Sequence, residues 1–194
     1  MAWKITTPPA AEPISLTEAK SYLRLDHATE DALVTSLITA ARQLVEQYTR
    51  LALVTQVVTE SLDKFPIWTI ENLDAIYLSV NPVQTIDSLT YIDQNGESQT
   101  LVATDYELDS TSEPARLTSS LDAQFWPGTL LAANAVTIVY TAGYGAAAAV
   151  PQGIIAGLYL TLGHLYSNRD AKGTNMAQLP YPVQALLNPF KVAR

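Results

Sequence analysis

Residues 135–168 read AVTIVYTAGYGAAAAVPQGIIAGLYLTLGHLYSN and join a strand pattern directly to a helix pattern. The first part, from Ala135 to Tyr140, is rich in the β-branched residues that favour a strand. Pro151 then suits the first position of a helix, which continues to about Asn168 and is apolar nearly all round. The stretch therefore predicts a buried strand that leads into a helix buried on several sides.

A membrane span is the first alternative for this region, because no charged residue occurs between Ala123 and Asn168. Proline, glycine and asparagine interrupt every apolar run before it reaches the roughly 20 residues that a spanning helix needs. We therefore expect a packed core and no membrane partner. The match of residues 143–148 to GxGxxA is typical of dinucleotide sites, but Pro151 marks a helix start that is too late for one.

Two further helices are predicted upstream. Ser15-Leu16-Thr17-Glu18 is a capping box, which predicts a short helix that ends at about Arg24. A longer helix follows Thr29, and its apolar stripe consists of Leu33, Leu37, Ile38, Ala41, Leu44, Val45 and Tyr48. Arg42 and Glu46 are placed on the opposite, polar side as an i,i+4 pair worth only a few tenths of a kcal/mol.

Between these helical regions the period changes to that of short strands. Asn95-Gly96 lies in a hairpin signal, because both residues accept the positive φ angles of tight turns. About seven strands with frequent turns indicate an antiparallel sandwich or barrel-like region. Their predicted positions are 54–59, 76–78, 86–92, 99–102, 106–108, 116–118 and 135–140.

These patterns predict an α+β fold. A small helical bundle, made of the N-terminal helices and the helix after Pro151, forms the core, and the antiparallel strand region is inserted within it. We expect a helical part over 1–50, an acidic strand region over 51–141, a buried helix over 142–170, and a flexible C-terminal segment with a short helix over 171–194. The two helical regions each have an apolar face, so we expect them to pack together.

The 194 residues are 48% hydrophobic and carry a net charge of −8. Residues 51–141 contribute −10 of this charge, residues 1–50 contribute −1, and residues 142–194 contribute +3. Such an acidic chain is unsuited to holding nucleic acid by neutralising phosphates. We therefore expect DNA to pass nearby at most, without specific binding.

Residues that would support catalysis or metal binding are scarce. The chain has no cysteine, which excludes disulfides and thiolate sites, and it has two histidines, His27 and His164, without metal-ligand spacing. No GxSxG elbow is present. We therefore predict no catalytic, cofactor-binding or metal-binding residues, and no enzyme activity.

Four sequence segments, in order, resemble a known family. They are Glu12 to Lys20 with Leu23 to His27, then Glu30 to Leu33 with Ala40 to Arg42, then Val139 to Gly145 with Val150-Pro151, and His164 to Asp170. Leu179 to Leu187 also resembles that family's short terminal helix. The family is the head-tail connector (adaptor, head-completion) proteins of tailed bacteriophages and prophages.

The resemblance implies a structural role in virion assembly. It implies a homo-oligomeric ring under the twelvefold portal of a filled capsid, which joins the head to the tail and keeps the DNA channel continuous. The implied partners are the portal protein, a tail completion or tail terminator protein, and further copies of the chain. The implied location is the head-tail interface of the virion, after synthesis in the bacterial cytoplasm.

Three sets of residues are candidates for these contacts. The apolar residues of the basic C-terminal segment, which we expect to become ordered on the portal, are candidates for portal binding. Small residues that admit a neighbouring backbone are candidates for subunit contacts, and acidic strand residues are candidates for the channel or tail surface. The sets are Tyr181, Val183, Leu186, Leu187 and Phe190; Gly153 and Gly157; and Asp105, Glu107 and Asp109.

A stand-alone binding module for carbohydrate or peptide is the main alternative, and an enzyme is the third. In the module, exposed aromatic side chains of the strand region would line a groove, although strand alternation places most of them in the core. The residues concerned are Trp68, Tyr77, Tyr91, Tyr106 and Trp126.

Overall fold

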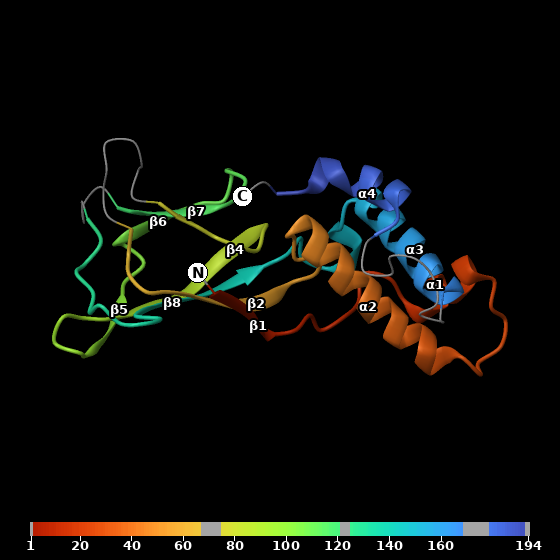
Figure 1. Cartoon of the computed structure of the whole chain (residues 1–194), viewed down its shortest axis with the longest axis horizontal. Helices are drawn as coiled ribbons and strands as arrows, with labels where there is room; N and C mark the ends of the chain where they lie inside the picture. The colour runs from red at the N-terminus through yellow and green to blue at the C-terminus, as the bar shows by residue number, and fades with distance from the viewer. Residues whose placement is uncertain (1, 67–74, 121–124, 169–178, 193–194) are drawn as a thin grey trace. The chain divides into compact units, whose positions relative to one another are not determined.

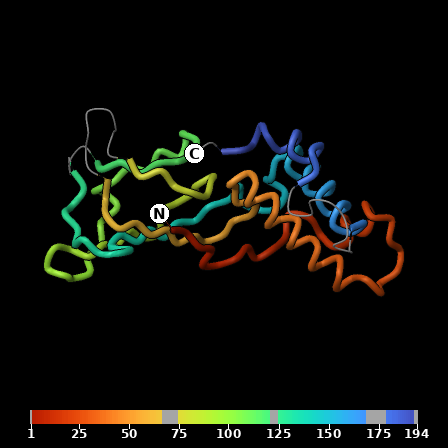
Figure 2. The backbone as a smooth tube through the Cα atoms, in the orientation of Figure 1, coloured from red at the N-terminus to blue at the C-terminus, as the bar shows by residue number. Residues whose placement is uncertain are grey.

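The computed structural model describes residues 2–66, 75–120, 125–168 and 179–192 (Figure 1). The chain divides into two compact units, which are described separately. The strand unit comprises residues 1–9, 55–143 and 193–194. The helical unit comprises residues 10–54 and 144–192, so the chain enters it twice (Figure 2).

The helical unit contains the helices that the sequence predicts. The expected helix over 171–194 is seen as α4 with a following 3-10 turn, and Trp68 and residues 169–178 lie outside the described residues. No helix within the described ranges is long and apolar enough to cross a membrane. The elements are α1 (Leu16–Leu23), α2 (Asp31–Thr49), η1 (Ala147–Ala149), α3 (Gln152–Ser167), α4 (Tyr181–Leu187) and η2 (Asn188–Phe190).

The capping box at the start of α1 is confirmed. The Glu18 amide donates to the Ser15 hydroxyl at 3.2 Å, and the Ser15 amide donates to the Glu18 carboxylate at 2.8 Å. Two otherwise unpaired amides are satisfied in this way. The hydrogen bonds that the Glu18 carboxylate accepts from the Ser15 amide and, at 2.7 Å, from the Ser15 hydroxyl lower the pKa of this carboxyl below its usual value.

One hydrophobic core joins α1, α2, α3 and α4. The predicted packing of the N-terminal helices against the helix after Pro151 is confirmed, since α2 contacts α3 along its length and α1 contacts both. The side chains that are most deeply buried there are Val34, Ile38, Ala41, Val45, Leu53, Ile154, Leu158, Leu162 and Leu187. Leu160 of α3 is exposed, so one side of this helix is left uncovered by the described residues although its sequence is apolar nearly all round.

The prediction for the polar face of α2 is wrong at Arg42 and Glu46. The side chains of these residues are only 4% and 9% exposed, whereas Leu33 of the predicted apolar stripe is exposed. The buried stripe is therefore rotated toward Arg42 and Glu46. Charged residues enter a core when each finds partners, and both do so here.

The strand unit contains two antiparallel sheets and, within the described residues, no closed barrel. The larger sheet has the order β1-β2-β8-β4-β5, and the smaller has the order β3-β7-β6. The predicted hairpin is confirmed, because Ile92 of β4 pairs with Ser98 of β5 across the Asn95-Gly96 turn. The strands are β1 (Ala2–Thr7), β2 (Gln56–Leu62), β3 (Ile76–Tyr77), β4 (Val83–Ile92), β5 (Ser98–Leu101), β6 (Tyr106–Asp109), β7 (Arg116–Ser119) and β8 (Val136–Ala142).

Strand β1 was not predicted. Within the described residues it pairs with β2 only (Figure 1). All six of its residues are exposed. Trp3 and Ile5 alternate with Lys4 and Thr6, but four alternating residues are a weak strand signal, which explains the omission.

Candidate assembly surfaces

The α4–η2 segment lies across two glycines of α3. A Cβ atom at Gly153 would lie 2.8 Å from the Phe190 ring, and one at Gly157 would lie 2.7 Å from Leu187 Cδ2. The close approach predicted for these glycines is therefore made within one chain. We assign Gly153 and Gly157 to the subunit's own helical core instead of to a contact between subunits.

The candidate portal-binding residues separate into buried and accessible ones. Val183 and Leu187 are buried in the helical core, and Phe190 packs against it. These three residues are therefore already covered by their own chain. Leu186 is partly exposed and Tyr181 is 82% exposed, so these two remain available to a partner.

Further contacts fix the end of this segment on α2. The Tyr48 hydroxyl donates to Asn188 Oδ1, the Lys191 ammonium lies 4.9 Å from the centroid of the Tyr48 ring, and the Val192 amide donates to the Thr49 carbonyl at 3.0 Å. The side of the helical unit formed by α2, α3 and α4 is thus a preformed surface.

A cavity of about 520 Å³ opens on the same side of the helical unit. Arg50 and Lys191 line it together with His164, and among the described residues its lining includes no acidic side chain. This concave, basic surface is suited to an acidic side chain or chain terminus of a partner. The other lining residues are Leu44, Gln47, Tyr48, Thr161, Leu165, Leu179, Pro180 and Gln184.

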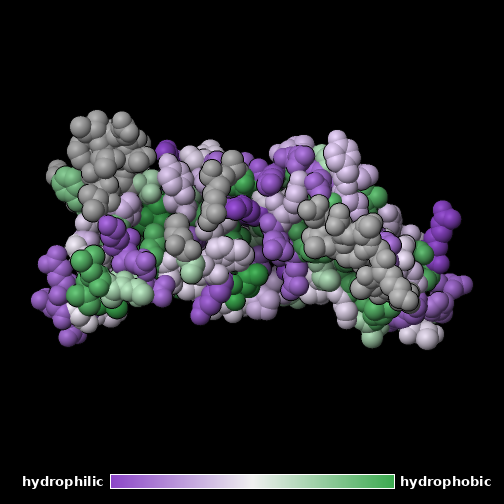
Figure 3. Space-filling model, viewed as in Figure 1, coloured by the Kyte–Doolittle hydropathy of each residue, from purple (hydrophilic) through white to green (hydrophobic). Residues whose placement is uncertain are grey.

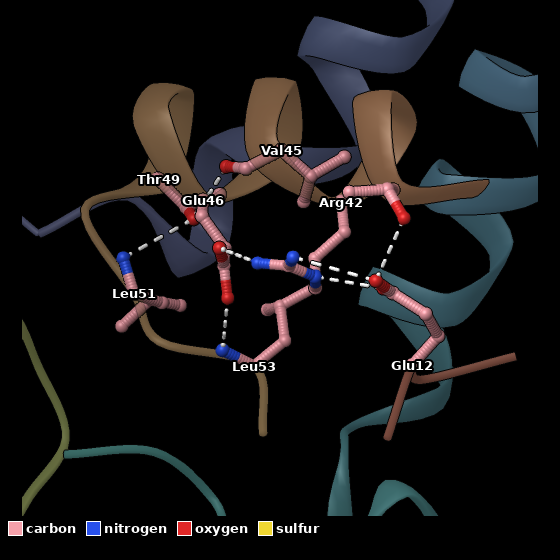
Figure 4. A network of polar contacts seen from close by, with 8 residues as sticks. Glu12, Arg42, Val45, Glu46, Thr49, Leu51 and Leu53 are labelled. Carbon is pink, nitrogen blue, oxygen red and sulfur yellow. Dashed lines mark hydrogen bonds and ion pairs between the residues drawn. The ribbon is translucent and has the colours of Figure 1, made fainter. Parts of the chain in front are cut away.

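A buried ion network lies within the helical unit (Figure 4). The Arg42 guanidinium donates to Glu12 at 2.7 Å and to Glu46 at 2.7 Å. The other Glu46 oxygen accepts a hydrogen bond from the Leu53 amide at 3.0 Å. Glu12 and Leu53 lie close to the points where the chain enters and leaves the helical unit, so the network fixes both points on α2.

The pKa values of this network follow from burial and pairing. Burial raises the pKa of the Glu46 carboxyl above its usual value, although the Leu53 amide and Arg42 act against it. Burial acts to lower the pKa of Arg42, but Glu12 and Glu46 outweigh it and the pKa is raised. A charged Arg42 is therefore required to keep Glu46 ionised in the core.

The net negative charge of the chain comes entirely from the strand unit. This unit has four basic and twelve acidic residues, a net charge of −8, and the helical unit has seven of each. Glu107 of β6 is exposed, and Asp105 is partly exposed just before that strand. These two carboxylates are accessible to a channel or to a tail protein.

Asp109 differs from these two acids because it is part of a turn. Hydrogen bonds from the Ser112 hydroxyl at 2.7 Å and the Ser112 amide at 3.1 Å lower the pKa of its carboxyl well below the usual range. The Arg116 guanidinium, at 2.9 Å, and the Thr111 amide add to the effect. The charge of Asp109 is thus compensated locally.

In the part of the chain that the structure describes, the aromatic residues of the alternative module do not line a common groove. The Trp126 and Phe65 rings are stacked, with their centroids 4.8 Å apart. The Phe65 and Tyr91 rings meet in a T-shaped arrangement, with their centroids 5.7 Å apart. Tyr77 is half exposed. Tyr91, Tyr106 and Trp126 are only partly buried, so the expectation that strand alternation places most of these aromatic residues in the core is not met by the described ones.

Sequence reasoning missed the basic cavity, since its two cationic side chains, Arg50 and Lys191, are far apart in the sequence. The glycines of the GxGxxA match have φ angles of 129° at Gly143 and 112° at Gly145, which suits a turn out of the last strand.

In the described residues no group of three metal-ligating side chains occurs.

Comparisons with known proteins place this fold. Residues 13–115 match the family described as phage gp6-like head-tail connector protein. A chain in the virion of a native gene transfer agent (GTA) particle is 24% identical, with a TM-score of 0.79, and the match covers 100% of this chain and 97% of that chain. A chain in the neck of an empty GTA particle, computed with C6 symmetry, gives 24% identity and a TM-score of 0.78 with the same coverage.

A third similar chain comes from the neck of a native GTA particle computed with C12 symmetry. It is 22% identical, with a TM-score of 0.72 and again 100% and 97% coverage. No match was found among curated proteins. The solved structures are therefore similar in fold over nearly the whole length of both chains.

Proposed function

Since the chain belongs to the phage gp6-like head-tail connector family, we propose that its copies form a ring between the portal and the tail of a phage-like particle. The ring joins the DNA-filled head to the tail and leaves an open channel for DNA. It acts as a structural part of the virion neck without catalysis. The observation that carries this proposal is the family match over residues 13–115.

Two further findings support a ring. Chains with the same fold occur in GTA necks computed with C6 and C12 symmetry. The charge difference between the units also provides two unlike surfaces, as a subunit with head-side and tail-side contacts requires.

We assign the portal contact to the helical unit. Tyr181 and Leu186 are accessible on α4, and the basic cavity that Pro180 and Gln184 help to line accepts an acidic group. An aromatic anchor next to a cationic cavity is the usual composition of an energetically important contact. The other three apolar residues, Val183, Leu187 and Phe190, hold α4 and η2 in place for this contact.

We assign the channel or tail contact to the strand unit. Its charge of −8 repels the phosphate backbone, so DNA moves past it without being held. The same charge is complementary to a basic surface on a tail completion or tail terminator protein. Asp105 and Glu107 are the acids that we place on this surface.

Reconstitution with the portal protein of the same particle tests the proposal. Purified chain and portal are mixed and measured by mass photometry, and the account predicts one complex of a portal with many copies of the chain. Tyr181→Ala combined with Leu186→Ala should weaken the complex, whereas Tyr77→Ala, a half-exposed tyrosine of the strand unit, should not. A chain that never associates with portal, in free form or in DNA-filled heads, contradicts the proposal.

A further inference from the structure

Both edges of the five-stranded sheet are available for pairing. Within the described residues β1 pairs with β2 only, and β5, at the opposite edge, pairs with β4 only. All residues of β1 and the first three of β5 are exposed. An edge strand presents unpaired amides and carbonyls, which form a template for a further strand.

The β1 edge also continues the apolar face of the sheet. Trp3 is paired with Glu60 and Ile5 with Val58, and both β2 partners are fully buried. Directly paired residues share a face of the sheet, so Trp3 and Ile5 lie on its buried face. They are nevertheless 50% and 40% exposed, so the residues that bury this face at β2 do not extend over β1.

Apolar surface also gathers beside the β5 edge. Val102 follows β5 directly and is exposed. Figure 3 shows hydrophobic surface at the end of the strand unit where Figure 1 labels β5.

Charge distinguishes these two edges from the rest of the strand unit. The unit holds twelve carboxylates, and of the strands only β2, β4 and β6 contain any, so both edge strands of the larger sheet are free of them. Two copies of so acidic a unit repel one another least where these strands meet. In addition, Lys4 on β1 is opposite in charge to the exposed Glu97 that precedes β5.

We propose that β1 of one subunit pairs with β5 of the next, so that the five-stranded sheets continue from copy to copy around the ring. Four successive antiparallel pairings make β1 and β5 parallel within one sheet. A neighbour related by rotation therefore presents β5 parallel to β1, and each copy uses one edge on either side. Such a contact is heterologous and repeats until the ring closes.

This inference rests on the proposed ring, and cysteine cross-linking tests it separately. The chain has no cysteine, so a Lys4→Cys variant with a second cysteine on β5, at Gln99 or Thr100, contains only the intended pair. A disulfide requires Cα atoms within about 7 Å, which adjacent strands provide. Mild oxidation of necks assembled on portal should give a ladder of multimers, because each copy links to two neighbours.

The controls separate the two proposals. Lys4→Cys combined with Thr111→Cys, an exposed position in the turn between β6 and β7, should give no ladder. Necks that contain a ring in electron micrographs but give no ladder with either β5 position overturn the inference and leave the proposed function intact. Portals without any ring contradict the proposed function itself.

A charge substitution provides an independent measurement. Thr100→Glu places a carboxylate on β5 and should lower the yield of assembled rings about tenfold, because like charges at a contact are strongly unfavourable. Thr111→Glu adds the same charge away from both edges and should assemble normally. Equal ring yields for the two variants overturn the inference.

Discussion

The Tyr140 hydroxyl donates a hydrogen bond of 3.0 Å to the Glu60 carboxylate, and both side chains are fully buried in the strand unit. Ser79 donates to the same carboxylate through its amide at 3.0 Å and its hydroxyl at 2.7 Å. The Val80 amide donates to the Tyr140 oxygen at 3.2 Å. The pair thus joins β2 and β8 to the segment that follows β3.

Tyr140→Phe should destabilise the protein by about 1–3 kcal/mol, because it leaves the Val80 amide without its partner and removes one of the three hydrogen bonds to the buried Glu60 carboxylate. Urea unfolding measures the change. Tyr181→Phe is the matched control, since that hydroxyl is exposed, and it should change stability by less than about 0.5 kcal/mol. Similar unfolding midpoints for the two variants would contradict this role for the pair.

We expect the buried Tyr140 hydroxyl to make the protein less stable at high pH. Burial, and then the charge of Glu60, raise the pKa of Tyr140 above its usual value of 10.0. The folded state therefore holds this proton more tightly, and its contribution is complete below pH 10 and is lost as the pH rises further. The wild type should lose stability between about pH 9 and pH 11 more steeply than Tyr140→Phe. Parallel pH curves would count against the assignment.

Arg42→Met should destabilise the helical unit by about 3–5 kcal/mol, because it leaves the Glu46 carboxylate buried without its cation. Adding Glu46→Gln should recover part of the loss, since glutamine is neutral and its side-chain oxygen still accepts from the Leu53 amide. Gln43→Met, at an exposed position on the same helix, is the control. Thermal unfolding measures all three, and a double variant less stable than Arg42→Met would refute the explanation.

Local signals predicted the helices and the hairpin. The capping box at Ser15, the turn at Asn95-Gly96 and the proline at residue 151 act within a few residues of the chain, and each forms as expected. Neighbouring residues alone determine such features, so the sequence pattern suffices.

Features that depend on distant parts of the chain were missed. Arg42 and Glu46 have the pattern of an exposed pair, and only Glu12 and the Leu53 amide make their burial favourable. Gly157 has the pattern of a contact site, but the residue that contacts it, Leu187, is 30 residues further along the sequence. The sequence pattern does not show that these two residues meet. Strand β1 alternates apolar and polar residues only from Trp3 to Thr6, and its pairing with the distant β2 makes it a strand.

Gly157→Val should destabilise the chain by about 1–3 kcal/mol, because the added side chain collides with Leu187 in the core. Portal binding should fall only as far as the folded fraction does. Ala156→Val, on the exposed side of the same helix, should have a small effect on both. A fully stable Gly157→Val variant that fails to bind portal would return this residue to a subunit or portal contact.

Asp105→Asn combined with Glu107→Gln should slow DNA ejection from assembled particles at low salt, because the channel loses charges that repel phosphate. Added salt should relieve the defect through screening. A dye that fluoresces on released DNA follows the rate. Asp109 is left unchanged because it holds its own turn, and unchanged ejection at low salt would leave solubility as the role of these acids.

Cryo-electron microscopy of the neck of complete particles tests the central claim most directly. The account predicts a closed ring of copies of this chain between the portal and the tail, with the helical units on the portal and an open channel through the centre. A neck in which portal and tail are in direct contact, with this chain elsewhere in the particle, would contradict it.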